Sequence, residues 1–150
     1  MSSQATAVAR EVDTFEEYTL FSLERSAPAL LGMMERSKQI AAGWPRIAAM
    51  VEAAKLCQEL AALVTFQDTL DSVFRFGEMD DGLGAQWKAM RDRFQFVMDT
   101  MEDVLELSEE GPVKRLFSVE TPGALNQFLE IIPLAVRHVR GTYMDEGVPD

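Results

Sequence analysis

Apolar side chains recur at steps of three and four residues between Gln86 and Glu110, and this repeat constrains the fold more than any other feature. The row consists of Trp87, Met90, Phe94, Val97, Met101, Val104 and Ser108. Such spacing is typical of a helix with one buried face. Acidic side chains occupy the opposite face, so the apolar row must be covered by other helices.

Similar repeats divide the rest of the chain into helical arms of comparable length. We expect four arms, at residues 14–41, 45–76, 85–110 and 113–140. Short connections between long helices favour antiparallel neighbours, and no stretch alternates apolar and polar residues as a strand does. The sequence therefore predicts an all-α, up-down-up-down four-helix bundle with kinked first and last arms. It forms a single domain over residues 1–150, with residues 1–12 and 142–150 flexible.

Proline and glycine residues predict where the arms bend and end. Pro28 lacks a backbone N–H, so we expect a kink or a short break near Ser26 in the first arm. Pro133 should bend the last arm for the same reason. Gly77–Gly84 carries three glycines and reads as a loop. Gly111–Pro112 should end the third arm, with one or two helical turns before the final helix.

The second arm, 45–76, carries two apolar rows. The row of its first half is Ile47, Met50, Val51, Ala54, Cys57 and Ala61, and that of its second half is Leu60, Leu63, Val64, Leu70 and Phe74. On a helical wheel the two rows point about 170° apart. The arm either breaks near Ala61–Thr65 or passes between different neighbours. Because no glycine or proline lies there, we expect one helix that changes neighbours.

Charge and hydropathy exclude several functional classes. The chain has 14 basic and 25 acidic residues and a net charge of −11, whereas nucleic-acid binding depends on clustered Lys and Arg. An anionic membrane surface is disfavoured for the same reason. We find no signal-peptide pattern and no apolar run long enough to span a bilayer. Cys57, the only cysteine, fits a reducing compartment. We expect a soluble, cytoplasmic protein with neither nucleic-acid nor membrane partners.

Two sets of residues could carry catalysis. Asp68, Asp71, Asp99 and Asp103 could hold the metal of a magnesium-dependent all-helical hydrolase. They lie opposite the apolar faces of their arms, however, and the metal-binding carboxylates of helical bundles project inward. His138 faintly resembles the histidine of helical phosphotransfer domains, but it lies in the last turn of its helix. We therefore expect no catalytic residues, no metal ligands and no cofactor, and keep both activities as alternatives.

Further apolar residues lie off the main rows of the last two arms. Phe96 and Leu107 occupy one flank of the third arm, and Ile131 and Leu134 leave the core face of the fourth, beside His138. Exposed apolar patches tend to mark interaction sites. The alternative is that the first arm or the turn before the last helix covers them.

The third arm ends in six carboxylates without a basic residue, from Asp99 to Gly111. A helix C-terminus favours cations, and like charges four residues apart repel. A basic partner, or Lys114 and Arg115, could relieve this repulsion. The sequence thus predicts a non-catalytic helical-bundle interaction or regulatory module that associates with a protein partner or with itself. The predicted surface consists of Phe96, Glu102, Glu106, Leu107, Ile131, Leu134 and His138.

Overall fold

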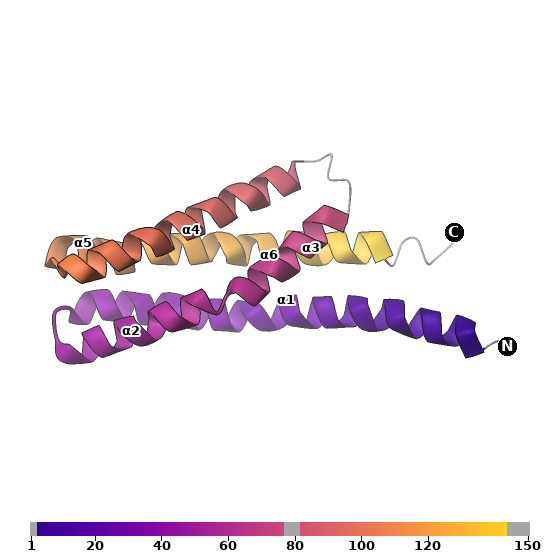
Figure 1. Ribbon diagram of the computed structural model, residues 1–150, viewed down its shortest axis with the longest axis horizontal. Coiled ribbons are helices and arrows are strands. Elements are labelled where there is room, and N and C mark those ends of the chain that lie inside the picture. The colour runs from indigo at the N-terminus through magenta and orange to yellow at the C-terminus, as the bar shows by residue number, and fades with distance from the viewer. Residues whose placement is uncertain (1–2, 77–81, 144–150) are drawn as a thin grey trace.

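A computed structural model describes residues 3–76 and 82–143 of the chain, and all of its regular elements are helices. In chain order they are α1 (Ser3–Gly43), α2 (Ile47–Ala61), α3 (Val64–Phe76), α4 (Leu83–Leu107), α5 (Glu110–Arg115), the π-helix η1 (Leu116–Glu120) and α6 (Thr121–Tyr143). No strand occurs in these two ranges, so the predicted all-α class is confirmed. The helices are compatible with the predicted up-down-up-down order (Figure 1).

The helices pack in two adjacent pairs. Figure 1 shows α2 beside α1 and α4 beside α6, and α1 also packs along α6. The short helix α3 contacts α1, α4 and α6. Helix α6 therefore has neighbours on several sides, namely α1, α3, α4 and η1. Among the described residues, no helix is both long enough and apolar enough to cross a bilayer.

A cluster of aromatic rings joins α3, α4 and α6. Phe128 of α6 is fully buried. Its ring centroid lies 5.5 Å from that of Phe66, 5.6 Å from that of Trp87 and 4.9 Å from that of Phe94. The rings are tilted against one another, an arrangement that aromatic pairs prefer to face-to-face stacking. One side chain thus holds two neighbouring helices against α6.

The predicted break in the first arm is absent, because α1 continues through Pro28. A proline inside a helix removes one main-chain hydrogen bond. The fully buried Leu23 and Leu30 hold the helix against its neighbours on both sides of the proline. Packing of this kind commonly overrides a local preference. Helix α6 likewise continues through Pro133.

The outer boundaries of the helices also differ from the prediction. Helix α1 begins at Ser3 rather than near residue 14, and α6 ends at Tyr143. The first residues of α1 are rich in alanine, and extending an existing helix requires no new nucleus. Most of the predicted Gly77–Gly84 loop, and residues 144–150 of the predicted flexible end, lie outside the described residues.

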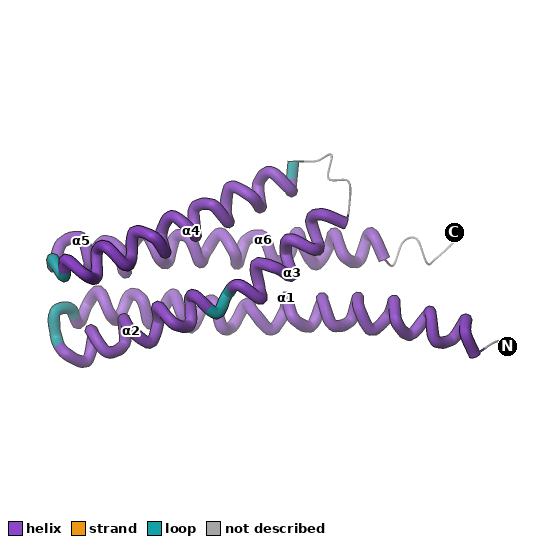
Figure 2. Tube along the Cα trace, viewed as in Figure 1, coloured by secondary structure: helices purple, strands orange, loops and turns teal. Residues whose placement is uncertain are grey.

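The second arm is two helices, so the expectation of one continuous helix was wrong. Figure 2 shows a short turn between α2 and α3, at Ala62 and Leu63. The Leu63 N–H donates to the Leu60 carbonyl at 3.1 Å, three residues back rather than four. This tighter bond ends the regular helical ladder without a glycine or a proline.

One buried row continues across this turn. Its members alternate at steps of four and three residues, and they are Ala49, Ala53, Leu56, Leu60, Leu63, Gln67, Leu70 and Phe74. The small side chains of Ala49 and Ala53 form the part of this row that faces inward from α2. Large side chains dominate a helical wheel, and for that reason the opposite face of α2 was predicted to be buried.

The final helix is preceded directly by α5 and η1, with no separate turn. A π-helical turn is wider than an α-helical turn and leaves main-chain groups without their usual partners. Here the Phe117 carbonyl accepts a hydrogen bond from the hydroxyl of Ser37 on α1. Ser37 is fully buried, so this bond satisfies a polar group inside the core and connects α1 to η1.

Replacing Phe128 by alanine tests the aromatic cluster. We expect the free energy of unfolding to fall by about 3–5 kcal/mol, because a buried ring is lost and a cavity remains. Urea denaturation followed by circular dichroism measures this change. Phe96→Ala is the matched control: Phe96 is 69% exposed, and its loss should cost less than about 0.5 kcal/mol. Equal losses in both variants would contradict the central position of Phe128.

Candidate interaction surface

Four of the residues in the predicted surface lie exposed on α4. Phe96 is 69% exposed and Leu107 is 71% exposed. Glu102 and Glu106 are exposed as well. Phe96 and Leu107 are eleven residues apart, close to three helical turns, so they share one flank of α4.

The three predicted residues of α6 are less exposed than those of α4. Ile131 is fully buried, so the expectation that it leaves the core face is wrong. Leu134 is partly buried against the core. The reason is that α6 contacts α1, α3 and α4, and residues away from its main row therefore also find neighbours. His138 is half-buried, with its ring centroid 6.2 Å from that of Phe74.

The largest departure from the prediction is an exposed apolar face on α2. Ile47 is 79% exposed, Val51 is 48% exposed and Met50 is 40% exposed. Ala54, one turn further along, is exposed too. These four residues, called here the α2 apolar row, follow the i, i+3, i+4, i+7 spacing of one helix face. They point away from the buried row of α2, so α2 has two apolar faces and the fold covers one.

The edge of the α2 apolar row meets α4 through a pair of sulfur atoms. The Sγ atom of Cys57 on α2 lies 3.1 Å from the Sδ atom of Met101 on α4. Met98 and Leu105 of α4 are partly buried on either side of Met101 in the sequence. Half-buried apolar side chains therefore lie where the two helices meet.

The Cys57 thiol also reports a nearby charge on α4. Burial raises the pKa of this thiol above its ordinary value, and the negative charge of Glu102 raises that pKa further. The thiol therefore stays protonated at neutral pH. Glu102 directly follows Met101, which contacts Cys57, so the Glu102 carboxylate lies close to the edge of the α2 apolar row.

The acidic residues of α4 lack neutralising partners. Asp99, Glu102, Asp103 and Glu106, called here the α4 acidic row, are all exposed. No ion pair joins any of them to a basic side chain of the described residues, and Asp99 accepts only a hydrogen bond from Gln95 at 3.0 Å. The row thus presents uncompensated negative charge near the C-terminus of α4.

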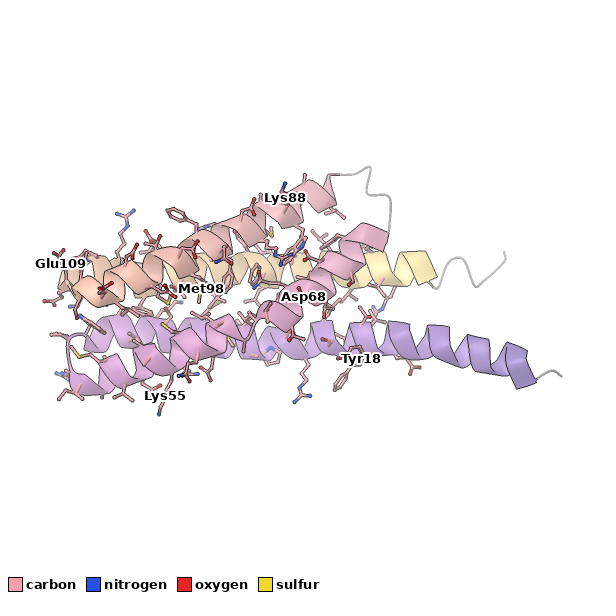
Figure 3. All side chains as sticks on the ribbon, viewed as in Figure 1. Tyr18, Lys55, Asp68, Lys88, Met98 and Glu109 are labelled. Carbon is pink, nitrogen blue, oxygen red and sulfur yellow. The ribbon has the colours of Figure 1, made fainter. Side chains whose placement is uncertain are left out.

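The far flank of α2 is electrostatically different. Glu52 and Glu59 both pair with Arg36 of α1, and the Glu52 pair measures 3.3 Å. Lys55 pairs with Glu52 at 3.5 Å, and Figure 3 shows Lys55 on the side of α2 away from α4. The acids on this flank are therefore paired. The α4 acidic row, on the other side of the α2 apolar row, has no basic partner among the described residues.

The four aspartates of the magnesium alternative do not form one site. Asp71 accepts a hydrogen bond from Trp87 Nε1 at 2.7 Å and pairs with Arg91. Asp68 lies 4.0 Å from the same guanidinium. In the described ranges, no group of three or more His, Cys, Asp or Glu side chains is placed to hold a metal ion. Arg91 therefore takes the position opposite these carboxylates that a cation would need.

A cavity of about 420 Å³ lies between α3 and α4, beside the same ion pair. Phe74 and Trp87 contribute its aromatic part, and Asp71, Lys88 and Arg91 line its polar part. Its volume is in the range of small-molecule sites. Asp71 and Trp87 are hydrogen-bonded to each other across it, however, and Arg91 satisfies the remaining carboxylate oxygen. The cavity therefore has a structural explanation in the bonding of α3 to α4.

Replacing Glu102 by glutamine tests the contact between α2 and α4. The pKa of Cys57 should fall, so the thiolate fraction at about pH 8 should rise and iodoacetamide should alkylate Cys57 faster, by less than about tenfold because burial remains. Mass spectrometry of the alkylated protein measures the rate. Asp103→Asn is the control, because Asp103 lies about 100° around α4 from Glu102. An equal acceleration in the control would argue against Glu102 lying beside Cys57.

The contact between Cys57 and Met101 brings the α2 apolar row and the α4 acidic row to the same side of the molecule. The sequence indicated the acidic part of this surface, and it missed the apolar part because Ile47, Met50 and Val51 were assigned to the core. The alternation of Ala49, Ala53, Leu56 and Leu60 was the signal that could have corrected the assignment.

No model of a known protein family, no curated protein and no solved structure matches this chain.

Proposed function

We propose that this chain is a non-catalytic helical-bundle module whose function is to bind other proteins. The observation that carries the proposal is the α2 apolar row, which includes an Ile47 that is 79% exposed. Exposed apolar side chains that line up along a helix are a recurrent feature of docking surfaces for a second helix. The row contributes nothing to the core of this chain, so its apolar character is explained by a partner.

The arrangement of α2 supports this role further. Helix α2 packs chiefly against α1 through Ala49, Ala53, Leu56 and Leu60. Its opposite face is therefore exposed, on a helix that is anchored to α1 through its buried row. A preformed, rigid surface loses little conformational entropy on binding.

Catalytic alternatives receive less support from the same residues. Arg91 occupies the position beside Asp68 and Asp71 where the magnesium-dependent hydrolase would need its ion. The histidine phosphotransfer alternative requires an accessible histidine at mid-helix. His138 lies half-buried beside Phe74 near the end of α6. Protein binding is the activity that the exposed side chains favour.

Selection from a library of helical peptides displayed on phage tests the proposal without assuming a partner. We expect peptides to be enriched on the wild-type chain and to lose binding to the Ile47→Asp plus Val51→Asp variant, because a charge at either position opposes burial of the row. Thermal unfolding serves as the control for folding: both side chains are exposed, so the melting temperature should change little. Enriched peptides that bind both proteins equally, or no enrichment, would contradict the proposal.

Self-association is a second form of the same activity, favoured by the exposed flank of Phe96 and Leu107. A dimer formed through this flank buries both side chains against a second copy. We expect the weight-average sedimentation coefficient of the wild type to rise with concentration, and that of Phe96→Asp plus Leu107→Asp to remain that of a monomer. A wild-type chain that stays monomeric at all concentrations would remove this form of the proposal.

A further inference from the structure

We infer that the surface between α2 and α4 receives a basic amphipathic helix of a partner protein. This inference rests on the proposed protein-binding function and specifies the chemistry of the partner. The apolar face of that helix would cover the α2 apolar row, and its Lys or Arg side chains would meet the α4 acidic row.

The α2 apolar row has a length and shape that suit a partner helix. The α2 apolar row runs from Ile47 to Ala54, which is roughly 10 Å or about two turns of a partner helix. The half-buried Cys57 and Met98 lie where α2 and α4 meet. A partner helix that lies beside α2 can thus place one apolar row against Met50 and Ala54. Methionine and cysteine side chains adapt readily to a partner's shape.

The α4 acidic row supplies negative charge along the other side of the surface. Glu102 directly follows Met101, whose Sδ atom lies 3.1 Å from the Cys57 Sγ atom, so the Glu102 carboxylate lies at the α4 side of the surface. Glu106 follows four residues later on the same face, and neither carboxylate has a basic partner among the described residues. Like charges at this spacing repel, and they lie near a helix C-terminus, where cations are favoured. Basic side chains on the docked helix would relieve both effects.

Charge also decides between the possible occupants. A second copy of this chain has a net charge of −11 and brings the same unpaired acids to the contact. Residues 144–150 carry three acidic residues and no basic one. Both occupants would place negative charge beside Glu102 and Glu106, which is unfavourable. A helix with Lys or Arg along the edges of its apolar face is complementary in both hydrophobicity and charge.

Binding of three synthetic helical peptides to the full chain tests this inference. The peptides share leucines at i, i+3, i+4 and i+7 and differ only in their flanking residues, which are Lys, Gln or Glu. Fluorescence anisotropy measures the dissociation constants. We expect the Lys peptide to bind most tightly and the Glu peptide most weakly. Added salt should weaken binding of the Lys peptide and leave binding of the Gln peptide nearly unchanged, because salt screens exposed charges.

Variants of the chain separate this surface from a general attraction to an acidic protein. Glu102→Gln plus Glu106→Gln should weaken binding of the Lys peptide about threefold to tenfold and leave binding of the Gln peptide unchanged. Glu35→Gln plus Asp92→Asn changes the net charge equally at exposed positions elsewhere. This control should have little effect. Equal weakening by the two double variants would overturn the inference, since the attraction would then be non-specific.

The apolar half of the surface has its own variant and its own readout. Met50→Ser plus Val51→Ser should weaken binding of the Lys and Gln peptides alike, by about tenfold or more, because each complex loses buried apolar area. A bound Lys peptide should also slow the alkylation of Cys57, which lies beside the row. Undiminished binding to the serine variant, or unchanged alkylation, would overturn the assignment of the peptide to this surface.

Other outcomes distinguish the inference from the proposed function. Equal binding of the Lys and Glu peptides through the α2 apolar row, or a dimer that the serine variant dissociates, would overturn the basic-helix assignment and leave protein binding intact. Failure of all three peptides, together with a library selection that enriches nothing, would overturn both.

Discussion

The enclosure of α6 by other helices is the constraint on which the rest of the structure depends. Phe128 sits at the point where α3 and α4 meet α6, in contact with Phe66, Trp87 and Phe94. Burying aromatic surface is among the largest favourable contributions to folding. Because α6 is covered by α1 as well, α2 is left at the periphery, where it packs chiefly against α1 and contacts α4 through Cys57. An exposed apolar face on α2 follows from that position.

Periodicity predicted the parts of the fold that large side chains dominate. Trp87, Met90, Phe94, Val97 and Met101 were expected to be buried, and all five are. Alanine gives a weaker signal, because it is common on both faces of helices. The contribution of Ala49 and Ala53 to the core of α2 was therefore missed. The turn at Ala62 and Leu63 was missed for a different reason: it is set by packing on either side and not by a helix-breaking residue.

The candidate surface depends on contacts between residues far apart in the sequence. The periodicity of one sequence does not predict which helices make those contacts. Ile131 and Phe96 both lie off the main apolar rows, yet one is fully buried and the other is 69% exposed. Only the position of neighbouring helices separates them. The acidic row was visible in the sequence. Its position beside an apolar face of α2 depends on the contact between Cys57 and Met101, which joins residues 44 apart.

The π-helical turn of η1 gives the chain an unusual tolerance in one place. A π-helical turn contains one residue more than an α-helical turn. If that residue is removed, the turn becomes a regular α-helical turn, and the helices before and after it keep their orientation about the helix axis. Shortening Leu116–Glu120 by one residue would therefore leave α5 and α6 facing the core as they do now. The same deletion inside α4 would rotate half of that helix by about 100° and turn its apolar row toward water. The chain can therefore lose a residue at η1 with less disturbance of the core than inside α4.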